Sequence, residues 1–127
     1  MLDVNKSVLI VDDMSSARQI VIKTVKTMGF TEIIQASNGL EAIDAIKDAK
    51  IPVGLIISDW RMPPYTGLDF LKMLKANPKT NTIPFLMVTS ESDKKDIFEV
   101  INAGADGYLL KPFTAEILVK KLRTMIK

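Results

Sequence analysis

The sequence SVLIVDD at residues 7–13 joins a short apolar run to two adjacent carboxylates. An uninterrupted apolar run of this length is typical of a strand covered on both faces, as in a parallel sheet. The arrangement recurs along the chain, where further apolar runs end at Asp59, Thr89 and Lys111. We therefore expect each of these polar residues to lie where a buried strand ends and a loop begins.

Strand-like and helix-like patterns alternate along the whole chain. The predicted strands are Ser7–Val11, Thr31–Ala36, Val53–Ser58, Ile83–Thr89 and Gly107–Leu110. The predicted helices are Ser15–Met28, Gly39–Ala49, Leu68–Ala76, Asp93–Ala103 and a last helix after Thr114. Proline and glycine predict a loop at residues 62–67. The alternation predicts a (βα)₅ α/β fold, doubly wound, with helices on both faces of a parallel sheet.

Helix faces and helix ends can also be predicted from the spacing. The apolar faces are expected to contain Ile20, Val21, Val25 and Met28 in the first helix, and Leu40, Ile43 and Ile46 in the second. Asn38 or Ser37 is expected to cap the second helix, and Thr114 the last. Glu116 then lies in a first turn, where the helix dipole favours a negative charge.

Length and composition limit the classes of protein that fit. The chain has 127 residues, and we expect one domain, residues 1–127. It has no cysteine, which excludes disulfides and thiolate metal sites, and no histidine, which excludes an imidazole base, ligand or phosphohistidine. The net charge of +2 argues against nucleic-acid binding as the main task, and the apolar runs are too short to insert into a membrane. We expect a cytoplasmic protein.

The carboxylates are the first candidates for chemistry. The carboxyl ends of parallel strands share one edge of the sheet, so Asp12, Asp13 and Asp59 should lie close together there. Oxygen ligands without nitrogen or sulfur donors favour Mg²⁺ or Mn²⁺. The structural alternative is that Asp12 or Asp13 caps the first helix.

Lys111 and Thr89 would meet the carboxylates at the same edge. Lys111 precedes a proline, and a cis peptide there would direct its side chain over the sheet edge. The alternatives are a surface lysine and a threonine bonded to local backbone. A carboxylate can accept a phosphoryl group where a divalent cation and an ammonium neutralise the charge.

The chain resembles the receiver domain of two-component response regulators over its full length, and within that family the single-domain chemotaxis regulators of the CheY type. The matching segments are VDD (11–13), SDWRMP (58–63), VTSES (88–92) and GYLLKPF (107–113). The resemblance implies a flavodoxin-like sheet with strand order 2-1-3-4-5.

The resemblance also implies roles for the site residues. Asp59 would accept a phosphoryl group from phosphohistidine on a histidine kinase of the CheA type. Asp13 would bind Mg²⁺ directly, Asp12 largely through water, and the backbone carbonyl of Arg61 would complete the protein ligands. Lys111 would pair with Asp59 and then with the phosphoryl group, and Thr89 would move inward to donate a hydrogen bond to it.

Other positions would tune or transmit the signal. Tyr108 would turn inward as Thr89 moves, or is simply a half-buried strand tyrosine. The output face would contain Lys94, Ile97, Tyr108 and Lys121, although Ile97 fits the core equally well by spacing. Arg61 and Glu91 flank the site, and we hypothesise that they pair over the phosphoryl group and alter water access. The lifetime of phosphorylated Arg61→Asn tests this idea, and an unchanged lifetime would remove it.

Several other functions compete with this interpretation. A haloacid-dehalogenase-type phosphatase uses similar groups, but there the acid pair comes last, whereas here it comes first. A dinucleotide site would need a glycine-rich turn, which Met14-Ser15-Ser16 does not provide. A non-phosphorylated interaction domain would not need the complete set of Asp12, Asp13, Asp59, Thr89 and Lys111.

We expect a self-phosphorylating acceptor with autodephosphorylation rather than a turnover enzyme.

The sequence defines the partner that receives the signal less well than it defines the site of phosphorylation. No output domain is expected after the last helix, so the signal would leave through a partner's surface. That partner would be the flagellar motor switch protein FliM, or, for a phosphorelay shuttle, a histidine phosphotransfer protein. The kinase, its stimulus and a possible phosphatase are not encoded in these motifs.

Overall fold

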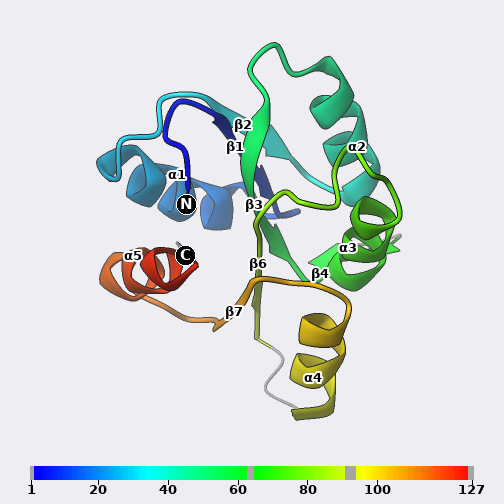
Figure 1. Ribbon diagram of the computed structural model, residues 1–127. Helices are drawn as coiled ribbons and strands as arrows, with labels where there is room; N and C mark the ends of the chain where they lie inside the picture. The colour runs from blue at the N-terminus through cyan, green and yellow to red at the C-terminus, as the bar shows by residue number, and fades with distance from the viewer. Residues whose placement is uncertain (1, 63–64, 91–93, 126–127) are drawn as a thin grey trace.

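Five parallel strands form the central sheet of the protein (Figure 1). The computed structural model describes residues 2–62, 65–90 and 94–125. The strands are β1 (Ser7–Val11), β2 (Ile33–Ala36), β3 (Val53–Asp59), β6 (Phe85–Thr89) and β7 (Gly107–Leu110). Their spatial order is β2-β1-β3-β6-β7. This is the predicted order 2-1-3-4-5 of the core strands, so the flavodoxin-like fold is confirmed.

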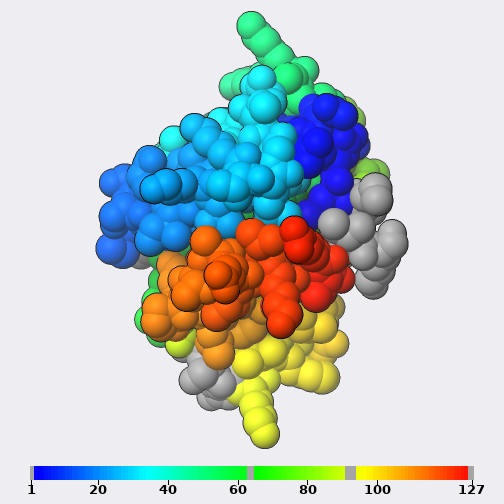
Figure 2. All heavy atoms as spheres, turned by 90° about the vertical axis from the view of Figure 1, so that its left-hand side faces the viewer, coloured from blue at the N-terminus to red at the C-terminus, as the bar shows by residue number. Residues whose placement is uncertain are grey.

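Helices cover both faces of the sheet. They are α1 (Ser15–Thr27), α2 (Gly39–Asp48), α3 (Gly67–Lys75), α4 (Lys94–Asn102) and α5 (Ala115–Thr124). Helices α1 and α5 lie on one face, and α2, α3 and α4 lie on the other (Figure 1). Figure 2 shows α1, in light blue, packed directly beside α5, in orange to red. No helix in the described ranges is both long and apolar enough for a transmembrane segment.

Each face of the sheet has its own apolar core. Alternate strand residues point to opposite faces, so Ile10, Leu55 and Val88 belong to the core under α1 and α5. Leu9 and Ile56 belong to the core under α2, α3 and α4. Strands β1, β3 and β6 are buried along nearly their whole length, as continuous apolar runs predict.

The predicted burial of two helix residues is wrong. Ile20 is 57% exposed and Leu40 is 49% exposed. Helix α1 packs against α5 as well as the sheet, which turns Val21, Ile22 and Val25 inward and leaves Ile20 at the margin. Helix α2 approaches the sheet through its small residues Gly39 and Ala42, which leaves Leu40 outside the contact.

The segment predicted as a loop at residues 62–67 contains additional structure. Strand β4 (Arg61–Met62) pairs antiparallel with β5 (Tyr65–Thr66). Strands of two residues are too short to show a period, so the sequence pattern does not predict them. Thr66 caps α3 and forms a reciprocal capping box with Asp69. The predicted caps Asn38 and Thr114 are confirmed, because each side chain accepts a backbone N–H of the following turn.

Candidate functional site

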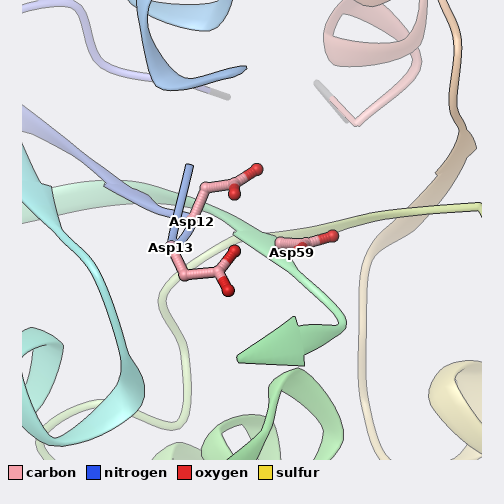
Figure 3. A group of neighbouring side chains, drawn as sticks. All are labelled: Asp12, Asp13 and Asp59. Carbon is pink, nitrogen blue, oxygen red and sulfur yellow. The ribbon is translucent and has the colours of Figure 1, made fainter. Parts of the chain in front are cut away.

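Three aspartates meet at the carboxyl edge of the sheet (Figure 3). Asp12 follows β1 and Asp59 ends β3, and Val11 and Ser58 are register partners in these adjacent strands. One carboxylate oxygen from each of Asp12, Asp13 and Asp59 lies within 4.8 Å of the others. The Asp12 and Asp59 side chains are only 9% and 12% exposed, and Asp13 is exposed. The predicted acidic cluster is therefore present and opens to solvent on one side.

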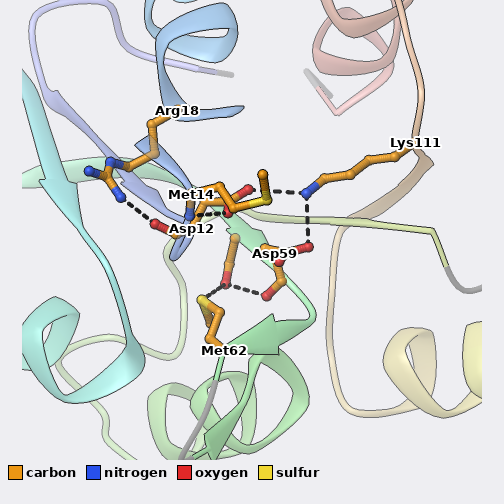
Figure 4. A network of polar contacts seen from close by, with 7 residues as sticks. Asp12, Met14, Arg18, Asp59, Met62 and Lys111 are labelled. Atoms are coloured by element: carbon orange, nitrogen blue, oxygen red, sulfur yellow. Dashed lines mark hydrogen bonds and ion pairs between the residues drawn. The ribbon is translucent and has the colours of Figure 1, made fainter. Parts of the chain in front are cut away.

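Lys111 bridges two of these acids. Its Nζ lies 3.1 Å from Asp12 Oδ2 and 3.1 Å from Asp59 Oδ1 (Figure 4). The Lys111-Pro112 peptide is cis. The lysine side chain is 27% exposed, which excludes the alternative of an ordinary surface lysine. One ammonium is thus shared between the carboxylates of β1 and β3, at a partly buried position where charge pairs are less screened than in water.

The surroundings of Asp59 and Lys111 change the pKa of each side chain. Burial raises the pKa of Asp59, and the nearby Asp12 charge adds to that rise, while Lys111 and the Trp60 N–H oppose it. Burial alone would lower the pKa of Lys111, but its hydrogen bonds and its attraction to Asp12 and Asp59 outweigh burial and raise that pKa. The ammonium is therefore held in its charged form between two acids that crowd each other.

Asp12 does not cap the first helix. The N-cap of α1 is Met14, whose side chain makes no capping hydrogen bond. Asp12 Oδ1 instead accepts the Met14 N–H at 2.9 Å, across a tight turn, and Asp12 Oδ2 accepts from Lys111. Both carboxylate oxygens of Asp12 therefore act inside the site, and the capping alternative does not hold for this residue.

Thr89 and Lys111 are fixed relative to each other by the backbone. The Lys111 N–H donates to the Thr89 carbonyl at 2.8 Å, and Thr89 is the register partner of Leu110 in the adjacent strand. Thr89 is 1% exposed. The ends of β6 and β7 thus bring a hydroxyl and an ammonium to the edge that holds the carboxylates, as the sequence predicts.

The sequence that forms this site matches known proteins over nearly its whole length. Residues 8–123 match the family model of the response regulator receiver domain. The chain belongs to this family. It is 39% identical over 121 residues to chemotaxis protein CheY-3 of Vibrio cholerae, across 95% of this chain and 92% of the relative. It is 35% identical over 118 residues to chemotaxis protein CheY1 of Helicobacter pylori, across 93% and 94%.

Solved structures give the same result. The chemotaxis response regulator CheY4 of Vibrio cholerae matches with a TM-score of 0.85 at 36% identity, over 95% of this chain and 98% of that chain. A response regulator receiver protein from Pseudomonas putida matches with a TM-score of 0.84 at 28% identity, over 94% and 97%. The predicted resemblance to receiver domains, and to the chemotaxis type within them, is confirmed.

The remaining predicted positions that the structure describes lie in β4, α4, β7 and α5. Arg61 is exposed in β4, and Glu91 lies outside the described residues, so their pairing stays a prediction. Tyr108 is half-buried in β7 and packs against the core on the α4 side of the sheet. Lys94 is exposed in α4, Ile97 is half-buried there, and Lys121 is half-buried in α5. Helices α4 and α5 both contact β7, and the role of this face as an output surface stays a prediction.

Two further features of the receiver domain were not predicted. A cavity of about 230 Å³ adjoins the acids, and its wall includes Ile20 and Val21 of α1 and Phe113 of the segment that follows β7. Gly67 begins α3 directly against the Asp59 carbonyl, where a Cβ would lie 2.2 Å from that oxygen. Neither feature has a pattern in the sequence, because both depend on distances that only the folded chain sets.

Replacing Asp59 with asparagine is expected to stabilise the metal-free receiver domain by about 1 kcal/mol at pH 7. The raised pKa means that the folded state holds the Asp59 proton more tightly than the unfolded chain does. The free energy of unfolding of the wild type therefore falls as pH rises from the ordinary pKa of 3.8 through the raised pKa. Asparagine cannot ionise, so the advantage of the variant should develop across that pH window.

Urea unfolding in EDTA, at pH 7 and in acid, measures this difference. Asp44→Asn removes an exposed aspartate in α2 and serves as the matched control. If Asp59→Asn is no more stable than the wild type at pH 7, ionised Asp59 does not lower the stability of the folded state, and the prediction is wrong.

Proposed function

We propose that this receiver domain accepts a phosphoryl group on Asp59 from a phosphohistidine of a histidine kinase. The observation that carries the proposal is the Lys111 ammonium, 3.1 Å from both Asp12 and Asp59, beside three converging carboxylates. A carboxylate that attacks an anionic phosphoryl group needs positive charge at the phosphoryl oxygens. Lys111 supplies one such charge from within the chain.

The donor set also fits a magnesium ion. Carboxylate oxygens from Asp12, Asp13 and Asp59 are hard ligands, and the described part of the cluster contains no sulfur or imidazole donor. Mg²⁺ or Mn²⁺ would be held by these residues and, as the resemblance implies, by the backbone carbonyl of Arg61. When bound, the ion would neutralise charge on the phosphoryl oxygens.

The transfer itself needs few groups. An Asp59 oxygen attacks phosphorus, an O–P bond forms, and the N–P bond of the donor breaks with its electron pair returning to the partner's imidazole. Lys111 stays charged and turns from Asp59 to the phosphoryl group, and Thr89 donates its hydroxyl to a phosphoryl oxygen. Hydrolysis later returns Asp59 to its starting state, so the protein is an acceptor with autodephosphorylation rather than a turnover enzyme.

The signal would leave through the face of α4, β7 and α5. Phosphorylation adds about −1.5 to −2 charges, which biases an existing two-state equilibrium. Thr89 and Tyr108 would move together, and Lys94, Ile97 and Lys121 would present the changed face to a partner. The relatives that are named chemotaxis proteins favour a chemotaxis output. The resemblance to that type then implies a CheA-type kinase in the cytoplasm and the flagellar motor switch protein FliM as partners.

The affinity of the phosphorylated form for a FliM N-terminal peptide tests this choice of partner. Binding that strengthens on phosphorylation supports the motor-switch output. Unchanged binding, together with transfer of the phosphoryl group to a histidine phosphotransfer protein, would assign the protein to a phosphorelay instead.

Intact mass after incubation with Mg²⁺ and acetyl phosphate tests acceptance itself. The wild type and Asp44→Asn are expected to gain one phosphoryl group, and Asp59→Asn is expected to gain none. EDTA should abolish the gain in the wild type and in Asp44→Asn. A gain that persists in Asp59→Asn would move the acceptor to another residue, and no gain in any protein, with Mg²⁺ binding intact, would limit acceptance to a cognate phosphohistidine donor.

A further inference from the structure

Arg18, in the second turn of α1, joins three segments next to the acid cluster. Its Nη1 donates to the main-chain carbonyl of Asp12, and its Nε donates to Gln35 Oε1 at 3.0 Å. Gln35 lies in β2, opposite Ile10 of β1. Figure 4 shows the guanidinium on one side of Asp12 and Lys111 on the other. The two cations thus hold different atoms of the same residue, one its backbone and the other its carboxylate.

The start of α1 has no side-chain cap. Its N-cap, Met14, makes no side-chain capping bond, and the first turn contains no acidic residue. A helix that begins this way lacks the usual side-chain acceptor for its first N–H groups. Arg18 does not supply that acceptor, but its guanidinium reaches back from the helix to the carbonyl of Asp12, the residue that follows β1, while the Asp12 N–H donates to the Ala36 carbonyl at 3.1 Å. The turn that carries Asp12 and Asp13 is therefore tied to both α1 and β2.

The turn also has to resist repulsion. The oxygens of Asp12, Asp13 and Asp59 lie within 4.8 Å of one another, and like charges at that distance repel. In the described part of the chain, Lys111 donates hydrogen bonds to Asp12 and Asp59 but not to the exposed Asp13, so it does not directly restrain that carboxylate. The Arg18 contact acts on the backbone next to Asp13 and so limits how far that carboxylate can withdraw.

We propose that Arg18, oriented by Gln35, is a positioning residue that holds the Asp12-Asp13 turn in the geometry that binds a divalent cation. The inference rests on the proposed magnesium site. Among the described residues, Arg18 donates to the Asp12 carbonyl and to Gln35 rather than to a carboxylate of the cluster, so it acts through the backbone. Groups that orient metal ligands from outside typically change metal affinity about 10–100-fold when they are removed.

The charge of Arg18 gives the opposite expectation, and that makes the proposal testable. A guanidinium near a cation site weakens binding of the cation by repulsion, so removing its charge without any positioning role would strengthen binding. The same guanidinium lies close enough to Glu41 to contribute to lowering the pKa of that carboxyl, after the larger effect of hydrogen bonds from Ser37. Positioning and charge therefore predict opposite signs for the change in affinity.

Titration with MgCl₂, followed by Trp60 fluorescence, measures the affinity without any phosphoryl donor. A parallel series of thermal unfolding curves by far-UV circular dichroism reports the stabilisation that Mg²⁺ gives. Arg18→Gln, which removes the charge, and Arg18→Lys, which keeps it but loses the two-pronged donor, are both expected to raise the Kd for Mg²⁺ about 10-fold. Gln35→Leu should raise it less. Arg123→Gln, exposed in α5, is the matched control and should leave it unchanged.

Each outcome decides the question. Weakened Mg²⁺ binding in Arg18→Gln and Arg18→Lys, with folded circular dichroism spectra, supports the positioning role. Binding that is unchanged or tighter in Arg18→Gln overturns it and leaves the proposed function intact. A wild-type protein that shows no response to Mg²⁺ in either measurement would overturn the magnesium site and this inference together.

Discussion

Replacing Lys111 with methionine is expected to slow phosphorylation of Asp59 by acetyl phosphate about 100-fold or more, which is the typical effect of removing one charge-stabilising group. Methionine keeps much of the length of the lysine side chain but removes the ammonium that Asp12 and Asp59 share at 3.1 Å each. The carboxylate would then attack an anionic phosphoryl group with one cation fewer. The initial rate of mass gain at saturating Mg²⁺ measures the loss.

The Lys111 prediction separates transfer from metal binding. Removing a cation from the acid cluster should not weaken Mg²⁺ binding, because Lys111 and the ion carry the same sign of charge. A variant that still binds Mg²⁺ but accepts phosphoryl slowly therefore places the defect at the transfer step. Lys120→Met, exposed in α5, is the control and should behave like the wild type. A Lys111→Met rate within about threefold of the wild type would contradict a role in transfer, since it lies far below the usual effect.

Replacing Gly67 with alanine is expected to destabilise the fold by about 3 kcal/mol, the upper end of the usual cost of overpacking. The added Cβ would lie 2.2 Å from the Asp59 carbonyl oxygen and 2.9 Å from the sulfur of Met87. The Gly67 N–H also donates to the Trp60 carbonyl at 2.6 Å, so α3 cannot retreat without losing that bond. The chain must displace either the start of α3 or the end of β3.

The Gly67 substitution should therefore affect stability and the site together. Urea unfolding measures the first effect, and the rate of phosphorylation by acetyl phosphate measures the second. Gly39→Ala is the comparison, because its Cβ would lie 3.3 Å from Phe70 and requires only a small adjustment. We expect Gly39→Ala to cost less than about 1 kcal/mol. A Gly67→Ala protein as stable as Gly39→Ala would mean that the backbone around Asp59 yields easily.

Much of this site could be predicted from the sequence because parallel strands impose a strong constraint. Once Val11, Ser58 and Leu110 are assigned as strand residues, the polar residues beside them must share one edge. The helix caps at Asn38 and Thr114 were predictable for a similar reason, since a cap depends on residues only three positions apart. Local rules and one topological rule thus carried most of the prediction.

The features that were predicted wrongly or not predicted at all depend on tertiary geometry. Ile20 fits a helical period, but it lines the cavity between α1 and the segment that follows β7 and is exposed, so the spacing alone predicted its burial wrongly. Leu40 is exposed because the small residues of α2 make the closest contact with the sheet. Arg18 looks like an ordinary surface arginine in the sequence, and only the fold brings it to the Asp12 carbonyl and to Gln35.

The lysine bridge has a consequence for synthesis of the protein. Lys111 is separated from Asp59 by 52 positions and from Asp12 by 99. A ribosome therefore releases all three aspartates long before it releases the ammonium that pairs with Asp12 and Asp59. A nascent chain that stops short of β7 lacks the ammonium that the Asp12 and Asp59 carboxylates share, and we expect competence for transfer only after β7 and the lysine that follows it have emerged.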